Sequence, residues 1–241
     1  MAAFLAVFFW VGTAEAACDL KHSQMLYPVV LVDLGTGSGS GTVIYSAKRE
    51  EAWHTYILTN NHVIATAVRV DDEWDAKEKK NIKRERRDAV KVYWFQYNDC
   101  SRSVGTIGRE ADILAYDVRT DLALLRIRDR ERGVDHVATI LPVNDQVFLA
   151  DTVWAVGAGL GKPPFMTQGT VSYQDFQIDG FRYLLSTAPI IFGNSGGALF
   201  HYSDIRKKYE LIGVPSRVSA TGFSVVSHMS WSVPAETVRD F

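Results

Sequence analysis

The sequence predicts an all-β protein built as a sandwich or a barrel. Its 241 residues contain many short apolar runs separated by glycine-rich and polar turns, with 18 glycines against 7 prolines. Runs at such spacing are typical of antiparallel sheets, not of alternating strands and helices. The predicted strands are 27–35, 41–46, 89–97, 121–128, 151–159, 169–178, 181–190, 196–200 and 209–214. Only the end of the chain, 233–241, reads as a short helix, with Pro234 near its first turn.

A shift in composition near 130–145 divides these strands into two halves. We place the boundary between residues 137 and 138. A hydrophobic content of 47% is enough for a large core in one domain or two small ones. The net charge of -2 gives no general attraction toward nucleic acid or anionic membranes, so we expect no nucleic-acid partner.

The first residues resemble a secretory signal. The apolar run from Ala2 to Val11 is too short to span a bilayer comfortably, and a small-x-small cleavage pattern, Ala14-Glu15-Ala16, follows it. No Lys or Arg precedes the run, so a buried first strand is the alternative. We expect 1–16 to be a signal peptide and the mature chain to be exported, periplasmic or secreted, with no stable membrane insertion.

The cysteine and histidine content is low. Cys18 and Cys100 are the two cysteines, and in an exported chain they could form a disulfide. The alternative is two unpaired cysteines without a structural role. The 6 histidines are scattered, and no spacing is typical of a metal site. We expect no metal and no cofactor.

The segment 71–88 breaks the strand pattern because most of its residues are charged. Its seven acidic and seven basic residues sum to zero. A basic run can bind phosphates, but interleaved acidic residues weaken its field. We interpret the segment as a solvated insertion, either a hairpin tip or a short helix.

Three residues have the contexts that nucleophilic serine catalysis requires. Such catalysis needs a base that takes the hydroxyl proton and a carboxylate that orients the base. His62 follows an apolar strand, Asp121 begins an apolar run, and Ser195 lies in a glycine-rich turn. Each one alone would be an ordinary turn, cap or surface residue. Asp112 and Asp117 are alternatives to Asp121 if the register is misread.

The stretches TNNHVI, RTDLALLRI and GNSGGAL resemble the histidine, aspartate and serine motifs of trypsin-like serine proteases, most closely the HtrA/Deg branch. The similarity extends to GSGSGTVI, ADTVWAVG, TQGTVS, ELIGV and SWSVPAETV, and so spans roughly residues 28–241. The resemblance implies two six-stranded antiparallel Greek-key β-barrels of the chymotrypsin type with a short C-terminal helix. The first barrel would occupy 17–137 and the second 138–241.

The resemblance also implies a role for each motif residue. Ser195 would be the nucleophile, His62 the general base and acid, and Asp121 the carboxylate that orients His62. The oxyanion hole would lie at residues 193–195, Gly193, Asn194 and Ser195, with the backbone N–H groups of Gly193 and Ser195 as donors. Digestive relatives carry an aspartate at position 194 that pairs with a freed amino terminus. A neutral amide cannot form that ion pair, so we expect loop order, at 161–167, to set activity instead.

In such relatives the residues before the serine motif and two facing segments line the pocket for the side chain that precedes the cut bond. Here the corresponding residues are uncharged: Ala188, Pro189, Ile190, Ile191, Phe192, Val214 and Ser230. His228 is the one ionisable residue nearby, and we assign it to a loop. An unpaired charge would be costly in this pocket, so we predict cleavage after Val, Leu, Ile or Ala.

The predicted function is a serine endopeptidase that acts on protein or peptide substrates through an acyl-enzyme. One alternative is a chaperone-like binder of unfolded chains with little proteolysis. Another is a dedicated processing protease of the virus or phage type. The sequence ends at Phe241, after the expected closing helix, so the resemblance covers a protease domain without a PDZ module. A homo-oligomer is compatible with the sequence, but residues 17–27 are too few to decide it.

Overall fold

The structure, a computed structural model, describes residues 20–77, 79–222 and 224–241. The expected signal peptide, 1–16, and Cys18 lie outside the described residues. The signal peptide and the pairing of Cys18 with Cys100 therefore stay predictions.

The first half of the chain forms a closed antiparallel barrel of six strands in the order β1-β2-β3-β8-β7-β6. These strands are β1 (Val29–Asp33), β2 (Ser38–Arg49), β3 (Ala52–Thr59), β6 (Val90–Asn98), β7 (Arg102–Asp117) and β8 (Leu122–Ile127). β-Branched and leucine side chains fill the barrel because they pack well on a pleated, buried surface. Val43, Ile57 and Leu125 are fully buried at its centre.

The second half forms a sheet of seven strands in the order β13-β10-β11-β12-β15-β14-β9. Its members are β9 (Thr139–Ile140), β10 (Thr152–Gly157), β11 (Phe165–Ile178), β12 (Phe181–Ser186), β13 (Ala198–Ser203), β14 (Lys208–Thr221) and β15 (Ser224–Pro234). Because β13 also pairs with β14, six of the strands close into a second antiparallel ring. The predicted fold class is confirmed, with one addition: β9 pairs in parallel with β14.

The helices of the described chain are short. They are η1 (His22–Leu26), α2 (Asn61–Ile64), η2 (Ala65–Ala67), η3 (Gly159–Gly161) and α3 (Ala235–Asp240). The predicted helix at the end of the chain is α3, which follows Pro234 at its N-cap. None of the helices in the described ranges is long and apolar enough to cross a membrane.

The element η1 precedes the first barrel in sequence but packs against the second. Met25 and Leu26 are buried in one apolar cluster with Tyr209 and Leu211. The side-chain oxygen of Gln24 accepts a hydrogen bond from the N–H of Tyr209 at 2.9 Å. The placement of 17–137 in one unit stays a prediction, and this first segment of it contacts the other barrel.

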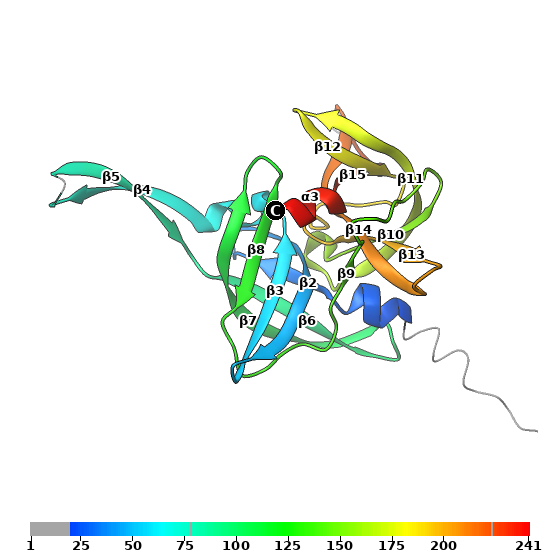
Figure 1. Cartoon of the computed structure of the whole chain (residues 1–241), viewed down its shortest axis with the longest axis horizontal. Coiled ribbons are helices and arrows are strands. Elements are labelled where there is room, and N and C mark those ends of the chain that lie inside the picture. The colour runs from blue at the N-terminus through cyan, green and yellow to red at the C-terminus, as the bar shows by residue number, and fades with distance from the viewer. Residues whose placement is uncertain (1–19, 78, 223) are drawn as a thin grey trace, which may run out of the picture.

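The charged insertion forms the two-stranded ribbon β4 (Val68–Asp75) and β5 (Lys80–Arg87), which extends away from the first barrel (Figure 1). Of the two alternatives, it is therefore a hairpin and not a helix. Cross-strand ion pairs such as Arg84–Glu73, at 2.9 Å, join the acidic strand to the basic one. Such pairs between opposite strands stabilise a ribbon that has little apolar surface to bury.

The two barrels share an apolar core. Leu58 and Leu122 from the first barrel belong to the same buried cluster as Val156, Phe200 and Leu211 from the second. The residues that follow the end of β3 and those that precede the start of β8 consequently lie at the junction of the two barrels. The candidate site forms at this junction.

Candidate active site

His62 is placed by a sharp change from strand to helix. β3 ends at Thr59, and the extended, fully buried Asn60 is the N-cap of α2. Its side-chain amide does not cap the helix but donates a hydrogen bond to the carbonyl oxygen of Asp121 at 2.8 Å. The N–H of Asn61 donates to the same oxygen at 3.2 Å. These two bonds fix the start of α2, and with it His62, beside Asp121.

Asp121 occupies the left-handed backbone region, with φ of 56°, immediately before β8. Leu122 and Ala123, which follow it, are fully buried and draw it into the protein, so Asp121 is only 8% exposed. Its Oδ2 lies 2.8 Å from Nδ1 of His62, and its Oδ1 accepts the backbone N–H of His62 at 3.0 Å. Since an ionised carboxylate only accepts hydrogen bonds, Nδ1 carries the proton in neutral His62, and Nε2 is left with a free lone pair.

A second hydrogen bond to the carboxylate comes from across the barrel junction. Ser216 Oγ on β14 donates to Asp121 Oδ2 at 2.6 Å. Burial is the largest single effect on the pKa of Asp121 and raises it. The hydrogen bonds from His62 and Ser216, with the charge of protonated His62, together outweigh burial, so the pKa of Asp121 lies below its usual value. The carboxylate is therefore ionised whenever His62 carries a positive charge near neutral pH.

Ser195 lies in the loop between β12 and β13. Gly196, with φ of 82°, follows it, and a Cβ there would collide with the carbonyl oxygen of Ser40 and the hydroxyl of Thr59. Only glycine fits this turn, which presses the backbone of Ser195 against β2. The carbonyl oxygen of Ser195 accepts the N–H of Ser40 at 2.7 Å.

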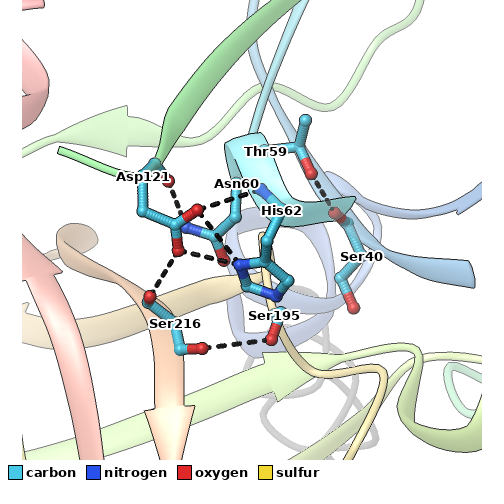
Figure 2. Close-up of polar contacts among 7 residues, drawn as sticks. All are labelled: Ser40, Thr59, Asn60, His62, Asp121, Ser195 and Ser216. Atoms are coloured by element: carbon cyan, nitrogen blue, oxygen red, sulfur yellow. Dashed lines mark hydrogen bonds and ion pairs between the residues drawn. The ribbon is translucent and has the colours of Figure 1, made fainter. Parts of the chain in front are cut away.

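Ser216 connects Ser195 to the His62–Asp121 pair. Its hydroxyl binds Asp121, and its carbonyl oxygen accepts a hydrogen bond from Ser195 Oγ at 3.3 Å. Figure 2 shows the ring of His62 with one nitrogen toward Asp121 and its other edge toward Ser195. The hydroxyl of Ser195 is thus turned to Ser216, and catalytic hydrogen bonds are often loose before substrate binds. The structure brings together the three residues that the motifs identified.

The loop before Ser195 leaves two N–H groups free. Asn194 donates its N–H to the carbonyl oxygen of Ile191 at 3.0 Å, so it is not available to a ligand. The carbonyl oxygen of Phe192 accepts the N–H of Leu160 at 2.8 Å, and in a trans peptide the N–H of Gly193 then points the opposite way. Within the described residues, the N–H groups of Gly193 and Ser195 have no partner. Of the three predicted oxyanion residues, these two have free donors.

The side chain of Asn194 stabilises the same loop. It is fully buried, and its Oδ1 accepts the N–H of Ile191 at 3.1 Å. The amide thus makes a short-range bond at the position where the resemblance expects an ion pair in digestive relatives. Leu160, whose N–H binds the carbonyl oxygen of Phe192, lies one residue before the segment 161–167 that we expect to set activity. Only part of this segment is a loop, because β11 begins at Phe165.

The two alternative aspartates do not contact His62. Asp117 accepts the N–H of Arg119 at 2.8 Å and caps the turn before β8. Asp112 pairs with Arg128 at 2.7 Å on the outside of the first barrel. Both have the ordinary structural roles that a lone aspartate usually has.

The predicted pocket residues divide into buried and exposed ones. Ala188, Ile190 and Val214 are at most 3% exposed and pack in the second barrel, whereas Phe192 is 68% exposed. Pro189 is exposed and Ile191 half-buried. The buried Ser230 lies 2.7 Å from the hydroxyl of Ser186, and its Oγ is 3.1 Å from the carbonyl oxygen of Ala188. His228, which we assigned to a loop, lies instead in β15 and is exposed. The assignment of the other residues to a substrate pocket stays a prediction.

Sequence reasoning missed Ser216 and Ser40. Ser216 is the last residue of the stretch 212–216, where we expected a wall of the pocket, and nothing in its local sequence points to Asp121, 95 residues away. Ser40 lies in the GSGSG run, where a serine reads as a turn residue. Both signals exist only in the folded chain. No group of three or more His, Cys, Asp or Glu side chains that could hold a metal occurs among the residues with described positions.

Two joined barrels with a His–Asp pair and a serine loop at their junction define the chymotrypsin-like class of protein. The chain belongs to the trypsin-like peptidase domain family, whose model matches residues 39–214. Within this family it is similar to serine proteases of the HtrA/Deg type, as the relatives described next show.

Two relatives illustrate this similarity. The chain is 28% identical over 209 residues to the periplasmic pH-dependent serine endoprotease DegQ of Escherichia coli, covering 84% of this chain and 36% of DegQ. It is 28% identical over 214 residues to the serine protease Do-like HtrA of Bacillus subtilis, covering 81% of this chain and 38% of that protein. The chain thus spans little more than a third of the length of these relatives.

A solved structure shows the same fold. The serine endoprotease from Yersinia pestis superposes with a TM-score of 0.61 at 22% sequence identity, over 92% of this chain and 64% of that one. At this identity the likeness shows the fold alone.

Proposed function

We propose that this chain is a serine endopeptidase that hydrolyses peptide bonds in protein substrates through an acyl-enzyme. The observation that carries the proposal is a series of hydrogen bonds that connects His62 to Asp121, Asp121 to Ser216, and Ser216 to Ser195. It joins a base, its orienting carboxylate and a nucleophile that are distant in sequence. The names of the relatives, serine endoprotease and serine protease, support the same activity.

In the proposed reaction, Ser195 Oγ attacks the carbonyl carbon of the substrate while Nε2 of His62 takes the hydroxyl proton. His62 then gives this proton to the leaving amine as the C–N bond breaks, which leaves an ester on Ser195. Water attacks the ester with His62 again as the base, and the acid product leaves. Asp121 stays ionised throughout and stabilises the imidazolium.

The negative oxygen of each tetrahedral intermediate would bind the free N–H groups of Gly193 and Ser195. Donors that are already fixed before the reaction stabilise developing charge without reorganisation. Loss of one such donor typically costs about 3 kcal/mol of transition-state stabilisation.

We propose cleavage after medium aliphatic residues. Ala188, Ile190 and Val214 give this part of the second barrel an apolar character. The hydroxyl of Ser186 binds that of Ser230, which also has backbone carbonyl oxygens as acceptors. A buried lysine, arginine or glutamate side chain would find no partner among these groups. Selectivity among aliphatic residues should be soft, since one methylene discriminates by about 10- to 200-fold.

We also propose that the chain acts outside the cytoplasm. The apolar start of the sequence and the relatives named periplasmic support this location.

Digestion of casein by the wild type and by Ser195→Ala tests the activity. We expect fragments from the wild type alone and labelling of Ser195 alone by a fluorophosphonate probe. If both proteins suppress aggregation equally and neither cuts casein, the chain is a chaperone-like binder instead. Sequencing of products from a mixed peptide library tests the specificity, and a dominant preference for Arg, Lys or Glu before the cut would refute it.

A further inference from the structure

Ser40 on β2 is fully buried. Its backbone N–H and carbonyl oxygen each make a hydrogen bond, and its hydroxyl acts both as a donor and as an acceptor. Its N–H donates to the carbonyl oxygen of Ser195 at 2.7 Å, and its own carbonyl oxygen accepts the hydroxyl of Thr59 at 2.7 Å (Figure 2). Its hydroxyl donates to the carbonyl oxygen of Gly193 at 2.6 Å and accepts the N–H of Ala158 at 2.7 Å. A serine of the first barrel thus binds two loops of the second.

The bond from Ser40 to Gly193 fixes one peptide plane of the oxyanion loop, residues 192–195. The Gly193–Asn194 peptide is held at both ends, its carbonyl oxygen by Ser40 and its N–H by the carbonyl oxygen of Ile191. A peptide plane held at two points cannot rotate without breaking one of them. This plane adjoins the N–H of Gly193 on one side and that of Ser195 on the other.

The bond from Ala158 acts on the neighbouring plane. Residues 158–161 form a turn, closed by the N–H of Gly161 on the carbonyl oxygen of Ala158 at 3.1 Å. This turn presents the N–H of Leu160 to the carbonyl oxygen of Phe192, which orients the N–H of Gly193. The hydroxyl of Ser40 therefore binds both the Gly193–Asn194 peptide and the 158–161 turn, which orients the N–H of Gly193.

The packing leaves little room for another arrangement. A Cβ on Gly39 would lie 2.6 Å from Val63 and 3.2 Å from the carbonyl oxygen of Ser195, and a Cβ on Gly157 would lie 3.0 Å from Ser40 Oγ. Because Gly39 and Gly157 have no side chain, the backbone segments at residues 40, 158 and 193 can meet at the hydroxyl of Ser40. Only a group that both donates and accepts can join a carbonyl oxygen to an N–H.

We propose that Ser40 is a positioning residue for the oxyanion hole. Its hydroxyl ties the Gly193–Asn194 peptide to the 158–161 turn, and so keeps the N–H groups of Gly193 and Ser195 directed toward the developing oxyanion. This inference rests on the proposed serine endopeptidase function and adds a residue of the first barrel to the machinery of the second.

Steady-state hydrolysis of a peptide p-nitroanilide ending in valine tests the role, with Ser40→Ala, Ser40→Thr and the matched control Ser46→Ala. Ser46 lies on the same strand, and its hydroxyl also has two partners, Thr55 and the N–H of Val134, each at 3.0 Å. We expect Ser40→Ala to lower kcat by about 10- to 100-fold with little change in KM, because a displaced donor weakens the transition state most. Ser40→Thr, which keeps a hydroxyl, should recover most of the rate, and Ser46→Ala should match the wild type.

Ligand affinities separate positioning from general damage. A peptide boronic acid, which forms a tetrahedral adduct with Ser195, should bind Ser40→Ala more weakly by the same factor as the loss in kcat/KM. The uncleaved substrate peptide should bind equally to Ser195→Ala and to Ser40→Ala/Ser195→Ala. Thermal unfolding checks that each variant is folded, and Ser40→Cys, with its weaker donor and acceptor, replaces Ser40→Ala if that variant does not fold.

The proposal is overturned if Ser40→Ala retains the wild-type kcat, if KM rises alone, or if Ser46→Ala loses as much activity. It is also overturned if boronic acid affinity stays unchanged while the rate falls. These outcomes presuppose an active wild type with a labelled Ser195. If the wild type hydrolyses no substrate, the proposed function fails, and the role of Ser40 fails with it.

Discussion

At the residue scale, Asp121 has the most demanding position in the site. Its carbonyl oxygen accepts bonds from Asn60 and Asn61, and its carboxylate accepts bonds from His62 and Ser216. Asp121→Asn keeps the shape and tolerates the left-handed backbone, but its amide can stabilise the wrong tautomer of His62. We expect kcat to fall by about ten-thousand-fold, measured with a peptide p-nitroanilide.

Asp117→Asn is the matched control for this substitution. Asp117 lies four residues earlier and binds only atoms of its own turn among the described residues, Arg119 N–H and the hydroxyl of Thr120. Its variant should retain the wild-type rate. Loss of activity in Asp117→Asn and retention in Asp121→Asn would show that the aspartate motif has been assigned in the wrong register.

The lowered pKa of Asp121 also predicts how stability depends on pH. A carboxyl whose pKa is lower in the folded state stabilises the protein above its ordinary pKa of about 3.9, and this stabilisation is lost as the pH falls through the lowered value. The difference in free energy of unfolding between wild type and Asp121→Asn should therefore shrink as the pH falls below about pH 4. Urea unfolding across this range measures it. A difference that grows toward low pH would contradict the direction of the shift.

At the element scale, the β4–β5 ribbon meets the body through its base. Glu85 accepts the hydroxyl of Tyr116 at 2.8 Å, and Arg87 donates to the carbonyl oxygens of Ile113 and Leu114. Asp71 and Arg84 are directly paired, so replacing 72–83 by Asn-Gly would leave a two-residue hairpin in the same register. We expect the free energy of unfolding to change by less than about 1 kcal/mol and casein digestion to continue at the wild-type rate.

Thermal unfolding and initial rates of digestion measure the effect of this deletion. Substituting Val70, which remains in the shortened ribbon and is 58% exposed, by Thr serves as the control for small surface changes. A large fall in rate with unchanged stability would mean that the ribbon contributes to substrate binding or to the position of His62.

Strands with strong apolar runs were predictable from the sequence, and others were not. The expected runs 89–97 and 121–128 are β6 (Val90–Asn98) and β8 (Leu122–Ile127) within one residue. β7 (Arg102–Asp117) was missed because its first nine residues are mostly exposed and polar, so no apolar alternation marks it. β15 (Ser224–Pro234) was also missed, because its first residues, 224–229, show no clear apolar alternation. Its pairing with β14 is a contact of the closed second ring, which local sequence does not specify.

The site divides in the same way. His62, Asp121 and Ser195 lie in motifs whose local sequence is distinctive. The contacts of Ser216 and Ser40 join segments 95 and 153 residues apart, and local sequence carries no information on them. The use of the Asn194 N–H within its own turn likewise depends on the backbone path of one loop, which a motif does not specify.

At the scale of the whole molecule, the two barrels share one apolar core, and η1 adds to it from the start of the described chain. Met25 is fully buried in the cluster that contains Leu58 of the first barrel and Phe200 of the second. A large, contiguous apolar interface favours unfolding of both units together. We therefore expect one calorimetric transition in which the calorimetric and van't Hoff enthalpies agree.

Met25→Ala tests this coupling. The substitution leaves a cavity between η1 and the second barrel, and burial at this level predicts a loss of about 2–5 kcal/mol. In a protein of this size that loss lowers Tm by about 5–15 °C. Met229→Ala, at a methionine that is 38% exposed, is the control and should change Tm little. If the barrels were coupled only weakly, the wild type would unfold in two steps and Met25→Ala would shift just one of them, whereas a shared core requires a single transition that moves as a whole.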